Sequence, residues 1–465
     1  MKIILTTLLI TLTIVSTSYS KDFNIEDYGA IGDGETLCTQ AVQKAIDACT
    51  FYGGGRVVVP SAKTYIIGTI YLKSNVTLYL EKNATLKSTL DYDLYTTDTY
   101  KTRYKLEKHM SRCLIYAEDA ENITIEGHGT IDGNALEEYF HPKNGTGRPM
   151  LMRFLRCNNF NVKDVTLINP ASWTTDWVFC DNITISGVDV VAQMQHNGAA
   201  IALDGCTNVQ VTNCNFDTSD DAVAITSSAK DKPSKNMVFS NCTFTGKWSA
   251  FRIGLLSLGD FESISVTNCT FTNITDAGFK IQMNEGAELK NMVFSNIVMK
   301  NVPRPIFMTF CQQKASVDAP DGMFPMKAMH HFNFNNMIID NSELDKDANI
   351  FITGMPNHYI TDIQLSDIQM ILPGGGTKED AEKENINEYT LDVLDGWWPE
   401  FKLIGTLPAS GIYVRHVNGI YMNNIQIKMA GEDARPPIVL EDVPNYAANE
   451  IYLNYKKLKS VVVRK

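Results

Sequence analysis

A short apolar motif recurs along the middle of the chain at a nearly constant spacing of 26 to 28 residues. Its copies are Asn182-Ile-Thr-Ile, Asn208-Val-Gln-Val, Asn236-Met-Val-Phe, Ser263-Ile-Ser-Val and Asn291-Met-Val-Phe. Each copy alternates like a short strand, and strands this short bury a face only when they stack on their neighbours. A constant long period of such strands predicts an all-β fold, a right-handed parallel β-helix in which each strand pairs with its equivalent one coil on.

Two kinds of side chain fall in register with this period. Asn213, Asn241 and Asn268 occupy equivalent places, which predicts an internal asparagine ladder that satisfies the backbone of a turn. A cysteine follows each of these asparagines directly. We interpret the three cysteines as a buried column of free thiols, in preference to disulfides.

The first twenty residues differ in character from the rest of the chain. Lys2 supplies a positive charge, Ile3 to Val15 is an almost uncharged apolar run, and small residues lead up to Ser20. This pattern is typical of a signal peptide and is too short for a mature membrane-spanning helix. We therefore predict an exported protein, periplasmic or extracellular, with a signal peptide at 1–20 and a single β-helix domain without a membrane segment at 21–465.

Outside the repeats, one segment has helical character and three others read as loops. The apolar residues of 39–50 recur at the spacing of an amphipathic helix, and such a helix can cap the open N-terminal end of a solenoid. Residues 97–112, 312–329 and 373–402 carry charges, proline, glycine and aromatic side chains without the repeat. Because long loops on a rigid scaffold often carry function, we expect these three to wall a cleft.

Composition and motifs exclude several classes of function. The formal net charge of −12 argues against nucleic acid, which requires a basic face, and means that local cations must capture any anionic substrate. The sequence has no CxxC, HExxH or Walker-type motif, so we expect no metal, redox or nucleotide cofactor. These observations do not identify what the cleft binds, and we expect the protein to be a monomer.

Four stretches carry longer motifs: Asp27 to Gly34, Tyr52 to Pro60, Gly127 to Gly133, and Cys206 to Ile225. Together they resemble glycoside hydrolase family 28, the polygalacturonase-like pectin hydrolases. The resemblance runs over nearly all of the mature chain, and the C-terminal third is similar to bacterial members. It implies a parallel β-helix that hydrolyses pectic polysaccharide.

The sharper motifs of that family are partly kept and partly lost. Its paired aspartates match Asp220-Asp221, and its Asn-Thr-Asp-Gly motif falls on Asn197-Gly-Ala-Ala200, so Ala199 replaces a third aspartate. Its Gly-His-Gly element falls on Trp248-Ser-Ala250, where the histidine is absent. Its Arg-Ile-Lys motif falls on Lys280-Ile-Gln282, which exchanges one cation and removes another.

The resemblance implies that Asp220 is the general acid and that Asp221 helps to activate water in an inverting hydrolysis. Adjacent residues of a straight strand face opposite ways, so both carboxyl groups can reach a cleft only at a bend. There the two charges repel, which would keep one group protonated as an acid. A solvated turn is the alternative for this pair. Losing the carboxylate at Ala199 should cost about a hundred- to ten-thousand-fold in rate.

A 28-residue period stacks Val223-Ala-Ile225 on Phe251-Arg-Ile253 and then on Phe279-Lys-Ile281. Arg252 and Lys280 would then stand in one outward column, where they would bind an anionic sugar together with Asn197. Salt bridges from these cations to a loop carboxylate are the alternative that remains open.

We therefore predict an exported glycoside hydrolase that cleaves a pectic or other uronate-containing plant polysaccharide or oligosaccharide by inverting acid/base hydrolysis. Two alternatives remain: a catalytically weak β-helix that binds glycan, and a polysaccharide lyase, which would often need Ca²⁺. Because Ala199, the absent histidine and the absent cation all weaken the family pattern, we expect unbranched polygalacturonan to be a poor substrate.

Overall fold

The computed structural model describes residues 21–105, 111–136, 140, 147–312, 315–319 and 327–464. The predicted signal peptide lies outside these residues. Within the described ranges, no helix is long and apolar enough to cross a membrane.

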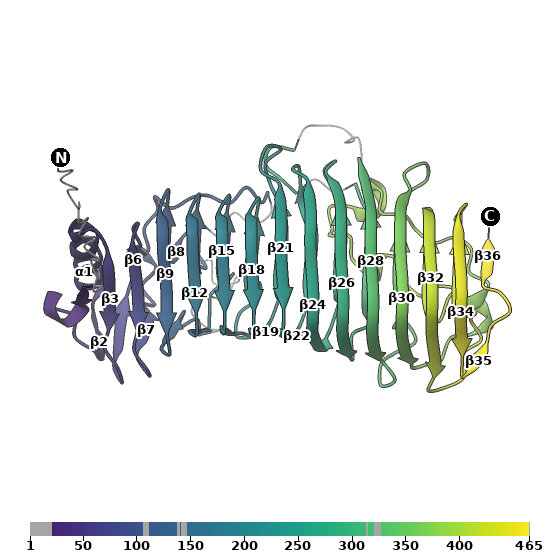
Figure 1. Ribbon diagram of the computed structural model, residues 1–465, viewed down its shortest axis with the longest axis horizontal. Coiled ribbons are helices and arrows are strands. Elements are labelled where there is room, and N and C mark those ends of the chain that lie inside the picture. The colour runs from purple at the N-terminus through teal and green to yellow at the C-terminus, as the bar shows by residue number, and fades with distance from the viewer. Residues whose placement is uncertain are drawn as a thin grey trace, which may run out of the picture.

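Two sheets of stacked parallel strands wind around one apolar core, and Figure 1 shows their coils following a single long axis from the N-terminal to the C-terminal end. Among the described residues, one sheet contains 13 strands and the other 23. The first comprises β5 (Ile70–Tyr71), β8 (Cys113–Glu118), β11 (Met150–Leu155), β14 (Thr175–Val178), β17 (Ile201–Asp204), β20 (Val223–Ser227), β23 (Phe251–Ser257), β25 (Ala277–Met283), β27 (Arg304–Phe310), β29 (Ile350–Thr353), β31 (Ile412–Arg415), β33 (Ile438–Glu441) and β36 (Val462–Arg464).

The second sheet bends at its corners and supplies the rest of each coil. It comprises β1 (Asp22–Asn24), β2 (Asp33–Leu37), β3 (Gly55–Val59), β4 (Thr64–Ile67), β6 (Val76–Leu80), β7 (Thr85–Ser88), β9 (Glu121–Gly127), β10 (Thr130–Asp132), β12 (Asn158–Lys163), β13 (Thr166–Ile168), β15 (Asp181–Ser186), β16 (Asp189–Ala192), β18 (Thr207–Thr212), β19 (Asn215–Thr218), β21 (Ser234–Ser240), β22 (Thr243–Gly246), β24 (Phe261–Ile274), β26 (Glu288–Lys300), β28 (Ala328–Asp340), β30 (Ile360–Leu372), β32 (Val417–Met429), β34 (Tyr446–Leu453) and β35 (Lys456–Lys457). Only β34 and β35 pair antiparallel among the strands described. One buried apolar cluster extends from Phe23 to Ile451.

These sheets confirm the predicted right-handed parallel β-helix, and the predicted capping helix is α1 (Thr39–Tyr52). In Figure 1, α1 lies at the N-terminal end of the solenoid. It buries the apolar stripe read from the sequence, Ala41, Val42, Ala45, Ile46 and Cys49. The helix ends at Gly53, whose φ of 102° is accessible to glycine at little cost. The short helices of the loops are η1 (Ile25–Tyr28), η2 (Tyr92–Leu94), α3 (Lys378–Ala381), α4 (Leu391–Leu394) and η4 (Phe401–Leu403).

The corners explain why the repeat begins with asparagine. Its first residues, Asn182, Asn208, Asn236, Ser263 and Asn291, have φ of 56°, 57°, 58°, 59° and 58°. The left-handed backbone is costly for most residues, but asparagine tolerates it because its short polar side chain bonds locally. The coils therefore turn at the positions where the period was read.

The asparagine ladder was predicted to be internal, and this is wrong. Asn213, Asn241 and Asn268 have φ of 56°, 58° and 56° at a second corner, and their side chains are exposed. The left-handed backbone at this corner directs each side chain toward solvent. These asparagines therefore allow the chain to turn, and the hydrogen bonds between their side chains lie outside the core. Asn268 Nδ2, for example, donates to Asn241 Oδ1 at 3.4 Å. The prediction of buried free thiols is confirmed, since all ten cysteines are buried and unbridged.

One column of outward-facing side chains on the 13-stranded sheet forms the floor of the functional site. Ala224 pairs with Arg252 and Arg252 pairs with Lys280, which is the register that the 28-residue period predicts. One coil earlier, Ala202 pairs with Ala224, and Asp176 pairs with Ala202. Ala224 is short where the next two members of the column, Arg252 and Lys280, are long, so the outer face of the sheet has a hollow at Ala224.

Parts of the three predicted loops meet at the rim of this hollow. Tyr104 of the first loop forms a bridge with Ser316 of the second. The Tyr104 ring stacks on Trp398 of the third loop, with ring centroids 5.4 Å apart and an interplanar angle of 18°. The loops therefore raise an aromatic wall beside the outward column.

Candidate active site

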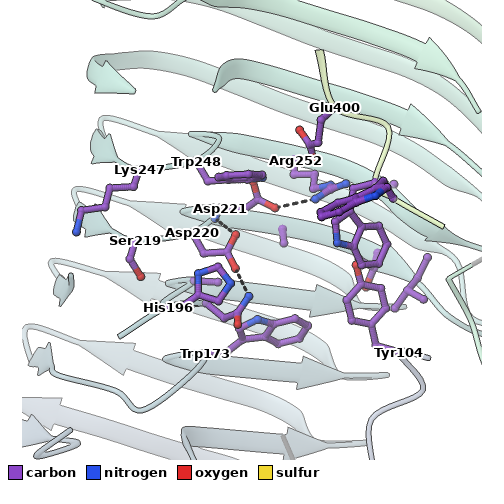
Figure 2. Close-up of a pocket in the computed structure, with 18 of the residues that line it drawn as sticks. Tyr104, Trp173, His196, Ser219, Asp220, Asp221, Lys247, Trp248, Arg252 and Glu400 are labelled. Atoms are coloured by element: carbon purple, nitrogen blue, oxygen red, sulfur yellow. Dashed lines mark hydrogen bonds and ion pairs between the residues drawn. The ribbon is translucent and has the colours of Figure 1, made fainter. Parts of the chain in front are cut away.

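A cavity of about 470 Å³ opens above the hollow, and Figure 2 shows the side chains around it. Ala199, Asp220, Asp221 and Ala224 contribute to its lining from successive coils of the sheet. Arg252 adds a cationic wall from the next coil. The paired aspartates predicted from the sequence therefore face the same space as the alanine that replaces a third one.

Both aspartates lie in the bend between β19 and β20, so neither is forced to the far face of a strand. Asp220 is half-buried. Its Oδ2 accepts a hydrogen bond from Asn197 Nδ2 at 3.1 Å, and its Oδ1 accepts one from the Asp221 backbone N–H at 2.8 Å. These donors fix the orientation of the Asp220 carboxyl group toward the cavity.

Asp221 lies deeper and is 5% exposed. Its Oδ2 is 3.2 Å from Arg252 Nη1 (Figure 2). Its Oδ1 accepts a hydrogen bond from the Ser249 backbone N–H at 3.2 Å. Burial raises the pKa of Asp221 to about 6; Arg252 opposes that rise and the charge of Asp220 adds to it. Asp221 can thus change its protonation state in the pH range where a general acid or base is useful.

Asn197 belongs to the support of Asp220 as well as to the cavity wall. Its backbone has φ of 60°, and its Oδ1 accepts a hydrogen bond from Arg148 Nη2 at 2.7 Å. That bond sets which end of the amide faces Asp220, because the Nδ2 group is then the one that donates to the carboxylate. The predicted substrate-binding residue is therefore placed to position the predicted acid.

Arg252 lines the cavity as predicted, but its charge already has a partner in Asp221. Its Nη2 donates to Gln282 Oε1 at 3.0 Å, while its Nε is buried and has no hydrogen-bond partner among the described residues. Burial acts to lower the pKa of Arg252, but Asp221, Tyr104 and Glu400 together outweigh it, so the net shift is upward. The guanidinium group stays charged beside the aspartate pair.

Lys280 is placed differently from the substrate-binding role predicted for it. It is fully buried and does not line the cavity. Its Nζ donates to Asp276 Oδ2 at 2.8 Å and to Glu400 Oε2 at 2.5 Å. Burial acts to lower the pKa of Lys280, but these two carboxylates raise it overall. The alternative of a salt bridge to a loop carboxylate is the one found, and we propose no direct contact between Lys280 and substrate.

Tryptophans dominate the wall of the cavity, and only one of them, Trp248, falls in a motif named from the sequence. Four of the five in the chain line it: Trp173, Trp248, Trp397 and Trp398. Trp397 is 57% exposed, and the others are half-buried. The flat apolar faces of indole rings are suited to the apolar faces of sugars, with the ring N–H left for a hydroxyl group. All four lie outside the strands, where the period predicts no register.

Three further polar residues of the lining were not singled out from the sequence. His196, Lys247 and Lys402 are exposed at the rim of the cavity. Neither lysine forms an ion pair with any residue that the structure describes, and Lys402 Nζ lies 4.6 Å from the centroid of the Trp397 ring. The cavity therefore has uncompensated cations at its mouth in place of the predicted Lys280.

The indole rings can stack on sugar rings, and the two carboxyl groups at the bend can act on a bond between sugars. The fold and this cavity are therefore those of a carbohydrate-active β-helix. Comparison with known proteins makes the class specific. The family described as glycosyl hydrolases family 28 matches residues 49–390, well over half of the chain. The chain belongs to this family, and it is a glycoside hydrolase.

Named relatives agree with this family. A probable polygalacturonase from Vitis vinifera is 25% identical over 76% of this chain and 75% of its own length. An exo-poly-alpha-D-galacturonosidase from Dickeya chrysanthemi is 27% identical over 78% of this chain and 69% of its own. Among solved structures, an exopolygalacturonase from Thermotoga maritima has a TM-score of 0.69 with 22% identity. The match covers 88% of this chain and 91% of the Thermotoga chain. At that identity the structural likeness supports the fold.

Proposed function

We propose that the protein hydrolyses a glycosidic bond in a uronate-containing pectic glycan, with Asp220 as general acid and Asp221 as general base. The observation that carries this proposal is the placement of both aspartates on one tryptophan-lined cavity, one reaching the open space and one buried against Arg252. The polygalacturonase names of the relatives support a pectic substrate. We also propose export, for which the apolar segment at 1–20 is the support.

In the proposed reaction, Asp220 gives its proton to the glycosidic oxygen as the bond from that oxygen to the anomeric carbon breaks. Asp221 takes a proton from a water molecule as the new carbon–oxygen bond forms on the opposite face of the sugar. Direct attack by water inverts the anomeric configuration. The greater exposure of Asp220 suits contact with the substrate, and the Arg252 guanidinium favours the carboxylate form that a base needs.

Charge at the mouth of the cavity supports a uronate substrate. Lys247 and Lys402 are the cations with room to meet a sugar carboxylate, since Arg252 and Lys280 already contact carboxylates of the protein. A chain of net charge −12 has no general attraction for an anionic polymer, so these local charges would provide it.

The substrate proposal is tested with a reducing-sugar assay on polygalacturonan, branched pectic glycans and neutral hemicelluloses. We expect release of reducing ends from at least one acidic pectic glycan, with unbranched polygalacturonan a poor substrate because Ala199 supplies no carboxylate. Activity confined to neutral glycans would contradict the uronate assignment. Binding without release from any of them would favour a glycan-binding protein.

The pH dependence tests which aspartate is the base. Because burial raises the pKa of Asp221 to about 6, a base at this position becomes active as pH rises through that value. We therefore expect kcat/KM to increase through about pH 6, and the midpoint to move upward in Arg252→Met, since Arg252 lowers the pKa of Asp221. If kcat/KM instead fell as pH rose through the same midpoint, Asp221 would be the acid and the two roles would be reversed.

A further inference from the structure

Glu400 is a carboxylate of the cavity that comes from a loop and has no counterpart in the repeat. It follows Trp397 and Trp398 in the third loop and lines the same space as the aspartate pair. Figure 2 shows it next to Arg252 on the cavity wall, and its charge contributes to the raised pKa of Arg252. The loop thus places a third carboxylate at the site, where Ala199 has removed one.

The two oxygens of Glu400 have different surroundings. Oε2 accepts a hydrogen bond from the buried ammonium of Lys280. Oε1 is buried and has no hydrogen-bond partner in the part of the chain described, and the residue as a whole is only 6% exposed. An unpaired carboxylate oxygen is costly to bury, so a site that keeps one has a use for an acceptor at that point.

The backbone around Glu400 is held firmly. Gln282 Nε2 donates to the Pro399 carbonyl oxygen at 2.7 Å, and Tyr389 Oη donates to the Glu400 carbonyl oxygen at 3.1 Å. Gln282 stands where the family pattern has its second cation, and its Oε1 also accepts from Arg252. Two departures from that pattern are therefore linked. Ala199 removes a carboxylate from the coil, and Gln282, which replaces a cation, holds the loop that brings the Glu400 carboxylate to the site.

Arg252, which lines the same cavity, also carries a buried polar atom without a partner in the described part of the chain. Arg252 Nε is buried and without a hydrogen-bond partner among the described residues, like Glu400 Oε1. A water molecule or hydroxyl group could accept a hydrogen bond from Nε or donate one to Oε1. Both atoms belong to side chains that line the cavity together with Asp221.

We propose that Glu400 is a catalytic residue whose Oε1 accepts a hydrogen bond from the attacking water. It would take over the role of the third aspartate, which Ala199 replaces. The proposal rests on the hydrolytic function proposed above. Asp221 receives one proton of that water, and Glu400 orients the water through its second O–H as oxygen bonds to the anomeric carbon. Lys280 is a positioning residue, since its Nζ holds Oε2 and leaves Oε1 without a partner among the described residues.

Glu400→Gln is the informative variant because Lys280 dictates how the amide lies. The ammonium attracts the amide oxygen and repels the NH₂ group, so the NH₂ group turns to the cavity and the acceptor is lost. We expect kcat on pectic oligosaccharides from partly hydrolysed plant pectin to fall about a hundredfold, with KM changed less than about threefold. Glu384→Gln, an exposed carboxylate of the same loop, is the matched control and should keep native activity.

A second variant separates catalysis from support of the fold. In Glu400→Ala, added formate can enter the vacated space and supply the missing carboxylate, so we expect it to restore part of the lost rate. A role limited to pairing with Lys280 would instead lower the melting temperature and raise KM, with no recovery in formate. Native kcat in Glu400→Gln, or a loss confined to KM, would overturn the proposal. Absence of turnover by the native protein would overturn the proposed function, and this inference with it.

Discussion

Asp220→Asn and Asp221→Asn should each lower kcat by about a hundred- to ten-thousand-fold, the range typical of losing a positioned acid or base. Asparagine keeps the shape of either side chain but can neither give up nor take a proton in this reaction. The measurement is kcat for release of reducing ends from the best pectic substrate. Asp231→Asn, at an exposed turn, is the matched control and should behave as the native protein.

The melting temperatures of the two variants should differ. Asp220 is half-buried and has only neutral donors around it, so we expect Asp220→Asn to melt close to the native protein. Asp221→Asn takes the carboxylate partner from buried Arg252 and should melt lower. Native turnover in both variants would show that the aspartates are a structural turn, which was the alternative for this pair.

Replacing Lys280 with methionine should lower the free energy of unfolding by about 3–5 kcal/mol, because it leaves carboxylates buried without their cation. Asp276 and Glu400 both depend on the same Nζ atom, and Lys280 itself has no exposed surface. Urea unfolding followed by circular dichroism measures the change. Lys73→Met removes an exposed pair with Asp47 and, as the control, should cost less than about 1 kcal/mol. A similar small loss for Lys280→Met would mean that the buried pairs contribute little.

Much of the scaffold could be predicted because the same corner and the same short strand recur in each coil. Each coil needs a corner with left-handed backbone, and asparagine or a similar residue at Asn182, Asn208 and Asn236 made that corner visible in the sequence. The same period fixed the strand register, including the pairing of Ala224 with Arg252 and of Arg252 with Lys280.

The side-chain environment of the site was harder to predict because it depends on loops without a period. Lys280 was correctly placed in the outward column, but one of its partners, Glu400, lies 120 residues further along the chain. Trp397 and Trp398 reach the cavity from the same loop. A repeat gives neighbours one coil apart, and it contains no information on where a long loop returns to the sheet. The outward direction of the corner asparagines was missed for a similar reason, since period alone does not say which way a left-handed residue points.

The most direct test of the account is a time course of proton NMR spectra during cleavage of pectic oligosaccharides by the native protein and by Asp220→Asn. We predict that the native protein releases saturated products whose new reducing end first appears with the anomeric configuration opposite to that of the cleaved bond. Asp220→Asn should release almost none in the same time. Unsaturated products, retained configuration, or equal release by the variant would contradict an inverting hydrolase with Asp220 as its acid.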